Sequence, residues 1–73
     1  EDRLVDVHNP VVPQSIRTRV LAMAQPGDQL WRCPRLSAPR GVLGILGVGP
    51  RDVVIEWWLL DAQGELIEAF WEA

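Results

Sequence analysis

The reactive side chains of this 73-residue chain are few: one cysteine, one histidine and ten carboxylates. A nucleophilic Cys33 needs a neighbouring base and a lowered pKa, and the surrounding sequence supplies neither. Acid–base catalysis by His8 needs an oriented second group, and one Cys with one His falls short of a standard zinc site. We therefore predict no catalytic residue, no bound metal and no cofactor, with Cys33 half-buried and His8 solvent-facing or hydrogen-bonded.

Two further patterns resemble a catalytic carboxylate pair and a phosphate-binding loop. Glu56, Glu68 and Glu72 are predicted to share a strand face, where a carboxylate pair can act as acid and base. The short chain implies no pocket there, so we interpret these acids as solvated. The glycine-rich residues 41–50 lack both the Gly-Lys-Ser/Thr and the G-x-G-x-x-G order of phosphate-binding loops, and Pro50 blocks a following helix. Glycine in an apolar run more often marks close backbone contact, which predicts a buried strand over 42–48 and a turn over 49–52.

The elements that would position these residues are best defined at the C-terminus, where residues 53–73 predict a β-hairpin. Residues 53–60 are rich in Val, Ile, Trp and Leu, which suit strands. Asp61-Ala62-Gln63-Gly64 predicts a type I turn with a glycine bulge and places Asp61 opposite Glu65. The resulting register has four apolar pairs, Leu59 with Ile67, Trp57 with Ala69, Ile55 with Trp71 and Val53 with Ala73.

This register divides the hairpin into two different faces. The apolar pairs are assigned to the core, together with Val20 and Leu21. The other face alternates apolar and acidic side chains, and contiguous exposed apolar surface commonly marks an interaction site. The predicted interaction surface consists of Glu56, Trp58, Leu60, Leu66, Glu68, Phe70 and Glu72.

The middle of the chain predicts one helix and one short strand. Ser15 can cap a helix over 14–25, in which Ile16, Val20, Leu21 and Ala24 recur at helical spacing. The segment also alternates as a strand would, but its Ala, Leu, Met and Arg content favours helix, and Pro26-Gly27 ends either element. Residues 29–32 predict a short strand that Pro34 ends or places at an edge.

Residues 1–13 predict an extended N-terminal arm, because Pro10 and Pro13 discourage both helix and ladder pairing. Val11 and Val12 can still pack onto the domain. A short edge strand involving Val5, Val7 and His8 is a further expectation for this arm.

All seven basic residues are arginine, and the charges are segregated. Residues 1–51 carry +3 and residues 52–73 carry −6. Such asymmetry indicates either a charged partner for one half or neutralisation of the halves by each other, and we favour neutralisation. The alternative is a basic patch for nucleic acid formed by Arg17, Arg19, Arg32, Arg35 and Arg40.

Together these patterns predict an α+β domain over residues 14–73, with one helix on a three- to four-stranded antiparallel sheet that ends in the C-terminal hairpin. A chain this short buries only about 60% of the surface that its unfolded form exposes. We therefore expect a non-catalytic protein-interaction module that forms a homodimer or binds another protein, with nucleic-acid binding as the alternative. The absence of a long apolar run or signal peptide predicts no membrane partner and a cytoplasmic location.

Overall fold

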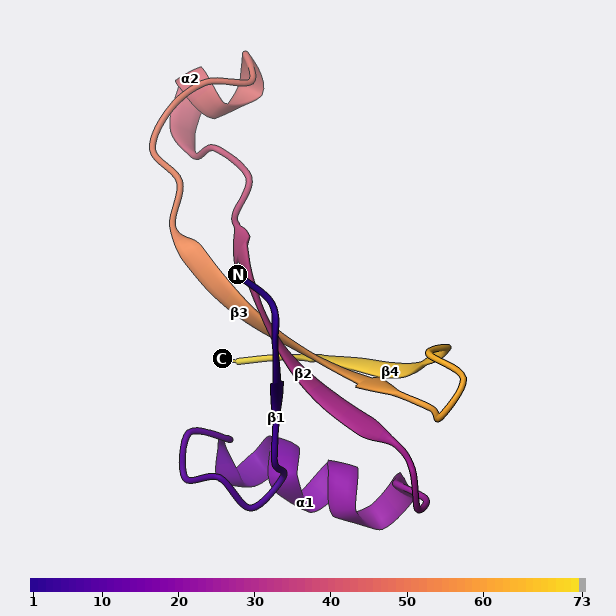
Figure 1. The fold of residues 1–73 in the computed structure, drawn as a ribbon. Coiled ribbons are helices and arrows are strands. Elements are labelled where there is room, and N and C mark those ends of the chain that lie inside the picture. The colour runs from indigo at the N-terminus through magenta and orange to yellow at the C-terminus, as the bar shows by residue number, and fades with distance from the viewer. Residues whose placement is uncertain (73) are drawn as a thin grey trace.

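The computed structural model describes residues 1–72 and has an α+β fold. Figure 1 shows its six elements, which in chain order are β1 (Arg3–Val5), α1 (Gln14–Met23), β2 (Gln29–Leu36), α2 (Gly41–Ile45), β3 (Val53–Leu60) and β4 (Leu66–Trp71). The four strands form one antiparallel sheet in the order β1-β2-β3-β4. The predicted fold class is therefore confirmed, including the C-terminal hairpin made by β3 and β4.

Helix α1 packs against one face of this sheet and divides it into two unlike sides. Ile16 and Val20 of α1 join a buried cluster with Trp57, Leu59 and Phe70 of the hairpin. No helix of residues 1–72 covers the opposite side, which we call the open face. Strand alternation and register assign it Leu4, Gln29, Trp31, Cys33, Arg35, Val54, Glu56, Trp58, Leu60, Leu66, Ala69 and Trp71.

The predicted helix is confirmed, although it begins without a side-chain cap. Pro13 is the N-cap residue, and its carbonyl accepts the backbone N–H of Arg17 at 2.9 Å. The expected cap, Ser15, lies inside the first turn instead. Ile16 and Val20 centre the buried stripe, while Leu21, expected in the core, is 52% exposed. Leu21 is turned about 100° from Val20 by helix geometry, so it lies at the margin of the stripe.

The first thirteen residues are part of the folded unit. Strand β1 pairs with β2, and Val5 and Val12 are buried in the core. The short edge strand thus lies over Arg3–Val5 and does not include Val7 or His8. The loop after β1 is held by Arg17, which donates to the carbonyls of Val7, Asn9 and Val12 at 2.8–3.0 Å.

Strand β2 is twice as long as the predicted 29–32 strand, because it continues through Pro34 to Leu36. Strand β1 begins at Arg3 opposite Arg32, so β2 has a strand neighbour only on the β3 side at Pro34. The missing N–H of proline is tolerated at such a position. Of the two predicted alternatives, Pro34 does not stop the strand but lies in a part of β2 that is paired on one side only.

The predicted buried strand over residues 42–48 is wrong. Residues 41–45 form the short helix α2, and residues 38–51, which we call the tip, extend away from the sheet (Figure 1). Three glycines of the tip, Gly41, Gly47 and Gly49, have φ between +77° and +125°, which an extended strand does not use. The tip leaves the sheet at Ser37 and returns at Asp52, and these residues exchange two hydrogen bonds of 2.8 and 2.9 Å.

The hairpin turn is as predicted, but the register beyond it is not. The N–H of Asp61 donates to the carbonyl of Glu65 at 2.8 Å, and Gly64 has φ +85°. Leu60 then faces Leu66, but Leu59 faces Glu68, so Ile67 is an extra residue in β4. This β-bulge shifts every later pair by one position, so that Trp57 faces Phe70 and Glu56 faces Trp71.

The bulge changes which β4 residues enter the core. Phe70 is buried, whereas Ile67 and Trp71, expected in the core, are 42% and 63% exposed, and Ala69 lies on the open face. The physical reason is that the shift places a large aromatic ring against Trp57, where the predicted register would place Ala69. The predicted pairing of Val53 with Ala73 lies outside the described residues.

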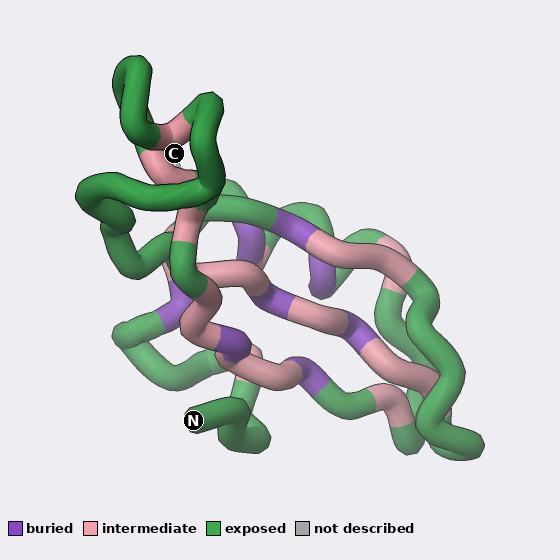
Figure 2. Tube along the Cα trace, turned by 90° about the horizontal axis from the view of Figure 1, so that it is seen from above, coloured by how far each residue is buried: buried purple, intermediate pink, exposed green. Residues whose placement is uncertain are grey.

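The core is small and lies between α1 and the middle of the sheet. Its buried cluster contains Val5, Val12, Ile16, Val20, Leu30, Trp57, Leu59 and Phe70, and Ile55 packs partly against it. Trp57, Leu59 and Val20 were predicted members. Figure 2 shows the buried segments gathered in this region, while the tip is almost entirely exposed.

Candidate interaction surface

The structure divides the seven residues of the predicted interaction surface between the two sides of the sheet. Glu56, Trp58, Leu60 and Leu66 lie on the open face, as predicted. Glu68, Phe70 and Glu72 lie on the side of α1, because the bulge at Ile67 inverts the remainder of β4. The predicted surface is therefore wrong for these three residues.

Each of the three misplaced residues has a partner within the fold. Glu68 forms a 3.0 Å ion pair with Arg19 of α1, whose guanidinium lies over the buried Phe70 ring at 4.6 Å. Glu72 accepts a 2.9 Å hydrogen bond from the indole N–H of Trp57, the most completely buried side chain. Two of the acids predicted to face a partner thus stabilise the hairpin and its packing against α1.

The open face has a row of apolar side chains across all four strands. Leu4, Trp31, Trp58 and Ala69 lie in register on β1, β2, β3 and β4. Trp71 adds a third indole beside this row. Sequence reasoning missed Trp31 and Leu4 as members of the surface. The signal that could have found them is the alternation of β2 continued past Pro34, which places Trp31 opposite Trp58.

A polar network lies beside this row and contacts Trp58. Arg35 makes hydrogen bonds of 2.6 and 3.1 Å to the two carboxylate oxygens of Asp2 and lies 3.8 Å from Glu56. Its guanidinium lies 5.4 Å from the ring of Trp58, and Glu56 accepts the Trp58 indole N–H at 3.3 Å. The hydrogen bond from Arg35 lowers the pKa of Asp2, so this carboxylate stays ionised in mildly acidic solution.

Cys33 is fully buried next to this network. Its pKa is raised, first by burial and then by the negative charge of Asp2. Both effects disfavour the thiolate, which is the reactive form. The interpretation of Cys33 as a structural residue fits this environment, although the side chain is more deeply buried than predicted.

The five arginines of the alternative basic patch do not lie together. Arg17 binds loop carbonyls, Arg19 pairs with Glu68, and Arg40 pairs with Asp52 at 3.2 Å. Arg35 and Arg32 lie on opposite sides of β2, and the Nε of Arg32 is buried without a hydrogen-bond partner among residues 1–72.

The segregated charges meet in ion pairs at the surface of the fold. Ion pairs join Arg19 to Glu68, Arg35 to Glu56 and Arg40 to Asp52, and each links the positive first part of the sequence to its acidic end. These three contacts agree with the expectation that the two halves partly neutralise each other.

The remaining candidate residue from the sequence is His8. His8 is exposed, and its backbone N–H donates to Asp6 at 2.7 Å. Within residues 1–72, no three His, Cys, Asp or Glu side chains are grouped as metal ligands, and no helix has the length and apolar character needed to cross a bilayer.

Comparison with protein-family models, with curated proteins and with solved structures finds no match in any of the three.

Proposed function

We propose that this chain is a small non-catalytic protein-interaction module that self-associates through the open face of its sheet. The observation that carries the proposal is the pair of neighbouring indoles, Trp31 and Trp58, in a row that no helix of residues 1–72 covers. Tryptophan is enriched at the energetic centres of protein interfaces, where it buries a large rigid area.

The apolar part of the open face is substantial for so small a chain. Besides the two indoles it includes Trp71, Leu4 and Leu66, which are 63%, 55% and 51% exposed. A core of eight residues leaves little material to cover this face from within the same chain. A two-fold dimer buries the same patch on both subunits and is the commonest closed arrangement of soluble chains.

The register of the hairpin removes an obstacle to such a dimer. With Glu56, Glu68 and Glu72 together on one face, stacking two copies would bring six carboxylates together. In the structure only Glu56 remains on the open face, and Arg35 lies 3.8 Å from it. Like-charge repulsion between stacked faces is therefore weaker than the sequence pattern implied.

Sedimentation equilibrium at micromolar concentration tests the proposal. We expect the unmodified chain to dimerise, and Trp58→Ala or Trp71→Ala to raise the dimer Kd about tenfold or more, as expected for a hot-spot residue. Leu36→Ala is the matched control, because Leu36 is 65% exposed but points to the other side of the sheet. A monomer unaffected by Trp58→Ala would contradict self-association and leave a different protein partner to be sought by pull-down.

The salt dependence of binding separates this function from nucleic-acid recognition. Contacts to phosphates weaken steeply as salt concentration rises, whereas apolar docking does not. We expect the dimer Kd to change little between about 50 and 500 mM salt, and a labelled oligonucleotide to bind weakly at both. Tight oligonucleotide binding that falls steeply with salt would favour the arginine-based alternative.

A further inference from the structure

The tip is the most exposed apolar segment of the chain. Its large side chains are Val42, Leu43, Ile45, Leu46 and Val48, with exposed fractions of 75%, 52%, 84%, 73% and 55%. None of them belongs to the buried core. The tip lies at the end of the molecule opposite α1 (Figure 1), where its apolar side chains are exposed in the described structure.

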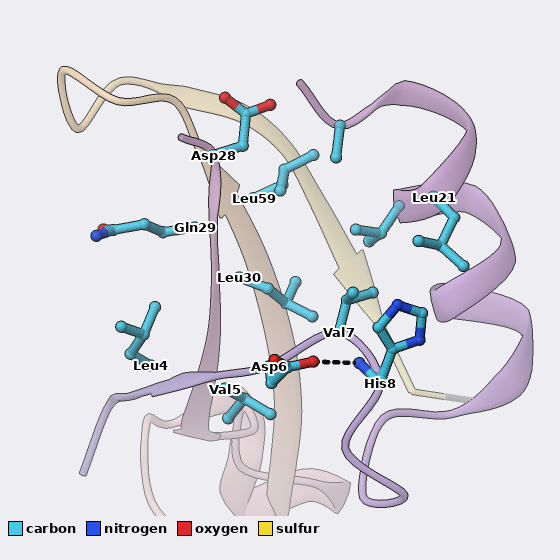
Figure 3. Close-up of a pocket in the computed structure, with 12 residues that line it drawn as sticks. Leu4, Val5, Asp6, Val7, His8, Leu21, Asp28, Gln29, Leu30 and Leu59 are labelled. Carbon is cyan, nitrogen blue, oxygen red and sulfur yellow. Dashed lines mark hydrogen bonds between the residues drawn. The ribbon is translucent and has the colours of Figure 1, made fainter. Parts of the chain in front are cut away.

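An apolar groove lies at the α1 end of the same molecule. It has a volume of about 430 Å³ and lies between β1 with its following loop, β2 and the C-terminal half of α1 (Figure 3). Its floor consists of core residues Val5, Val20, Leu30 and Leu59, and Leu21 forms part of one wall. The groove therefore opens directly onto the core, and an apolar occupant would extend that core.

The charges around the two features are complementary. Asp6 and Asp28 line the groove, and each accepts a backbone N–H at 2.7 Å. Neither is in an ion pair within the described part of the chain. The tip has no acidic residue and ends at Arg51, which is exposed and likewise has no ion pair among residues 1–72. Arg40, near the start of the tip, adds a second positive charge, which is partly balanced by Asp52.

We propose that the tip of one molecule inserts into the α1 groove of a second copy. The molecule is 46 Å long, and its tip and groove lie at opposite ends, so a chain cannot fill its own groove. The volume falls within the range of about 300–1,000 Å³ that is typical of binding clefts, enough for a few apolar side chains. The contact joins unlike surfaces, so it generates either a reciprocal pair or a longer series of molecules.

This contact goes beyond the proposed function, because it uses neither Trp31 nor Trp58 and shares only Leu4 and Gln29 with the open face. Self-association through the open face and insertion of the tip can each hold without the other. The experiments must therefore distinguish the open-face contact from the tip–groove contact. A site-directed disulfide cross-link between tip and groove makes this distinction.

The cross-link uses two variants that carry tags of different size. One has Ile45→Cys on the tip, and the other has Leu21→Cys on the groove wall. Cys33 stays in place in both, because it is buried and its pKa is raised. Under mild oxidation we expect a mixed disulfide dimer in several-fold higher yield than with Leu66→Cys in place of Leu21→Cys. Leu66 is the matched control, since it is 51% exposed against 52% for Leu21 but lies on the open face. Equal yields would overturn the proposal.

Two further variants identify the forces at the contact. Val42→Asp places a charge where an apolar side chain of the tip should be buried, and Arg51→Glu removes the charge complementarity. When the groove variant is paired with a tip variant that also carries Arg51→Glu, or with one that has Val42→Asp beside Ile45→Cys, we expect at least a fivefold loss of the mixed disulfide. Trp58→Ala should leave the yield unchanged. A cross-link lost with Trp58→Ala alone would overturn the proposal and assign the association to the open face.

A lipid surface is the remaining alternative partner for the tip, because exposed apolar loops with flanking arginines also bind membranes. The unmodified chain is therefore sedimented with vesicles of phosphatidylcholine containing phosphatidylserine. We expect it to stay in the supernatant. Tip-dependent pelleting, lost in Ile45→Asp and accompanied by no mixed disulfide, would overturn insertion into a second copy.

Discussion

At the scale of the residue, Cys33 lies where its chemistry is suppressed. It is buried among side chains that include Asp2, and both burial and this carboxylate raise its pKa. We expect a thiol reagent at pH 8 to modify Cys33 at least about a hundredfold more slowly in the native chain than in guanidinium chloride, because the thiolate is both scarce and covered. Absorbance of released thionitrobenzoate follows the reaction. A native rate close to the unfolded rate would show that this part of the open face opens frequently.

Arg32 has a buried polar group that makes no hydrogen bond within the described residues. Its Nε is buried without a partner among the described residues, and a buried unpaired donor costs about 1–3 kcal/mol. Arg32→Met keeps an unbranched apolar stem and removes the donor. We expect it to leave the free energy of unfolding unchanged or raise it by about 1 kcal/mol, as measured by urea denaturation.

The control for this substitution is Arg3→Met. Arg3 lies opposite Arg32 on β1 but is exposed, so its replacement should change the free energy of unfolding by less than about 0.5 kcal/mol. A clear loss of stability in Arg32→Met alone would show that the guanidinium makes a stabilising contact through its other nitrogens.

Within the β3–β4 turn and α2, a side chain added to a glycine should have different effects, a loss of stability at Gly64 and a local rearrangement at Gly44. Gly64 has φ +85° in the β3–β4 turn, and the space that a Cβ would enter there is open, so Gly64→Val should cost about 1 kcal/mol or more through backbone strain alone. A Cβ on Gly44 would clash with the backbone carbonyl of Pro39, so Gly44→Ala must rearrange α2. The tip has no core residue, and its rearrangement should leave global stability nearly unchanged.

Thermal melting and amide NMR shifts together check both glycines. Gly64→Val should lower the Tm by several degrees while the shifts of the tip stay in place. Gly44→Ala should leave the Tm nearly unchanged while the amide shifts of the tip change. A large loss of Tm in Gly44→Ala would mean that the tip packs on the sheet in solution.

Prediction from the sequence succeeded where local chemistry decides the structure. The Asp61-to-Gly64 turn depends on a side chain that binds nearby N–H groups and on a residue that tolerates positive φ, and both are visible in the sequence. The helix over Gln14–Met23 likewise has helical spacing and ends before Pro26. These elements needed no knowledge of distant residues.

Prediction failed where contacts between distant residues decide the structure. The bulge at Ile67 follows from the packing of Phe70 against Trp57 and α1, and it also brings Glu68 within reach of Arg19. Neither contact is encoded near Ile67. The candidate site therefore was half predictable, because Trp58 and Leu60 follow from β3 alone, whereas Trp31 depends on the pairing of β2 with β3.

At the scale of the whole molecule, the tip is separable from the rest of the fold. Ser37 and Asp52 are already joined by two hydrogen bonds at its base, and none of its residues is buried. We expect that replacing residues 38–51 by Asn-Gly, which favours a two-residue hairpin turn, retains the far-ultraviolet circular dichroism of the sheet and a Tm within a few degrees of the original.

The same deletion also provides a control for association. It should abolish insertion into the groove while leaving the open face intact. Loss of the folded state on deletion would contradict the separable tip, and a scrambled sequence of equal length in its place would then show whether loop length or apolar content is responsible.

The order of the strands has a consequence for how the chain folds in time. Every strand pairs only with its neighbours in the sequence, and five residues connect β3 to β4, sixteen connect β2 to β3 and twenty-three connect β1 to β2. Shorter loops cost less entropy to close, so the β3–β4 hairpin is expected to form first and to serve as the template for β2. Helix α1 and β1 then join last. During synthesis, Val5, Ile16 and Val20 are made well before Trp57 and Phe70. The side chains of Val5, Ile16 and Val20 therefore stay exposed to solvent until the hairpin has formed and buries them.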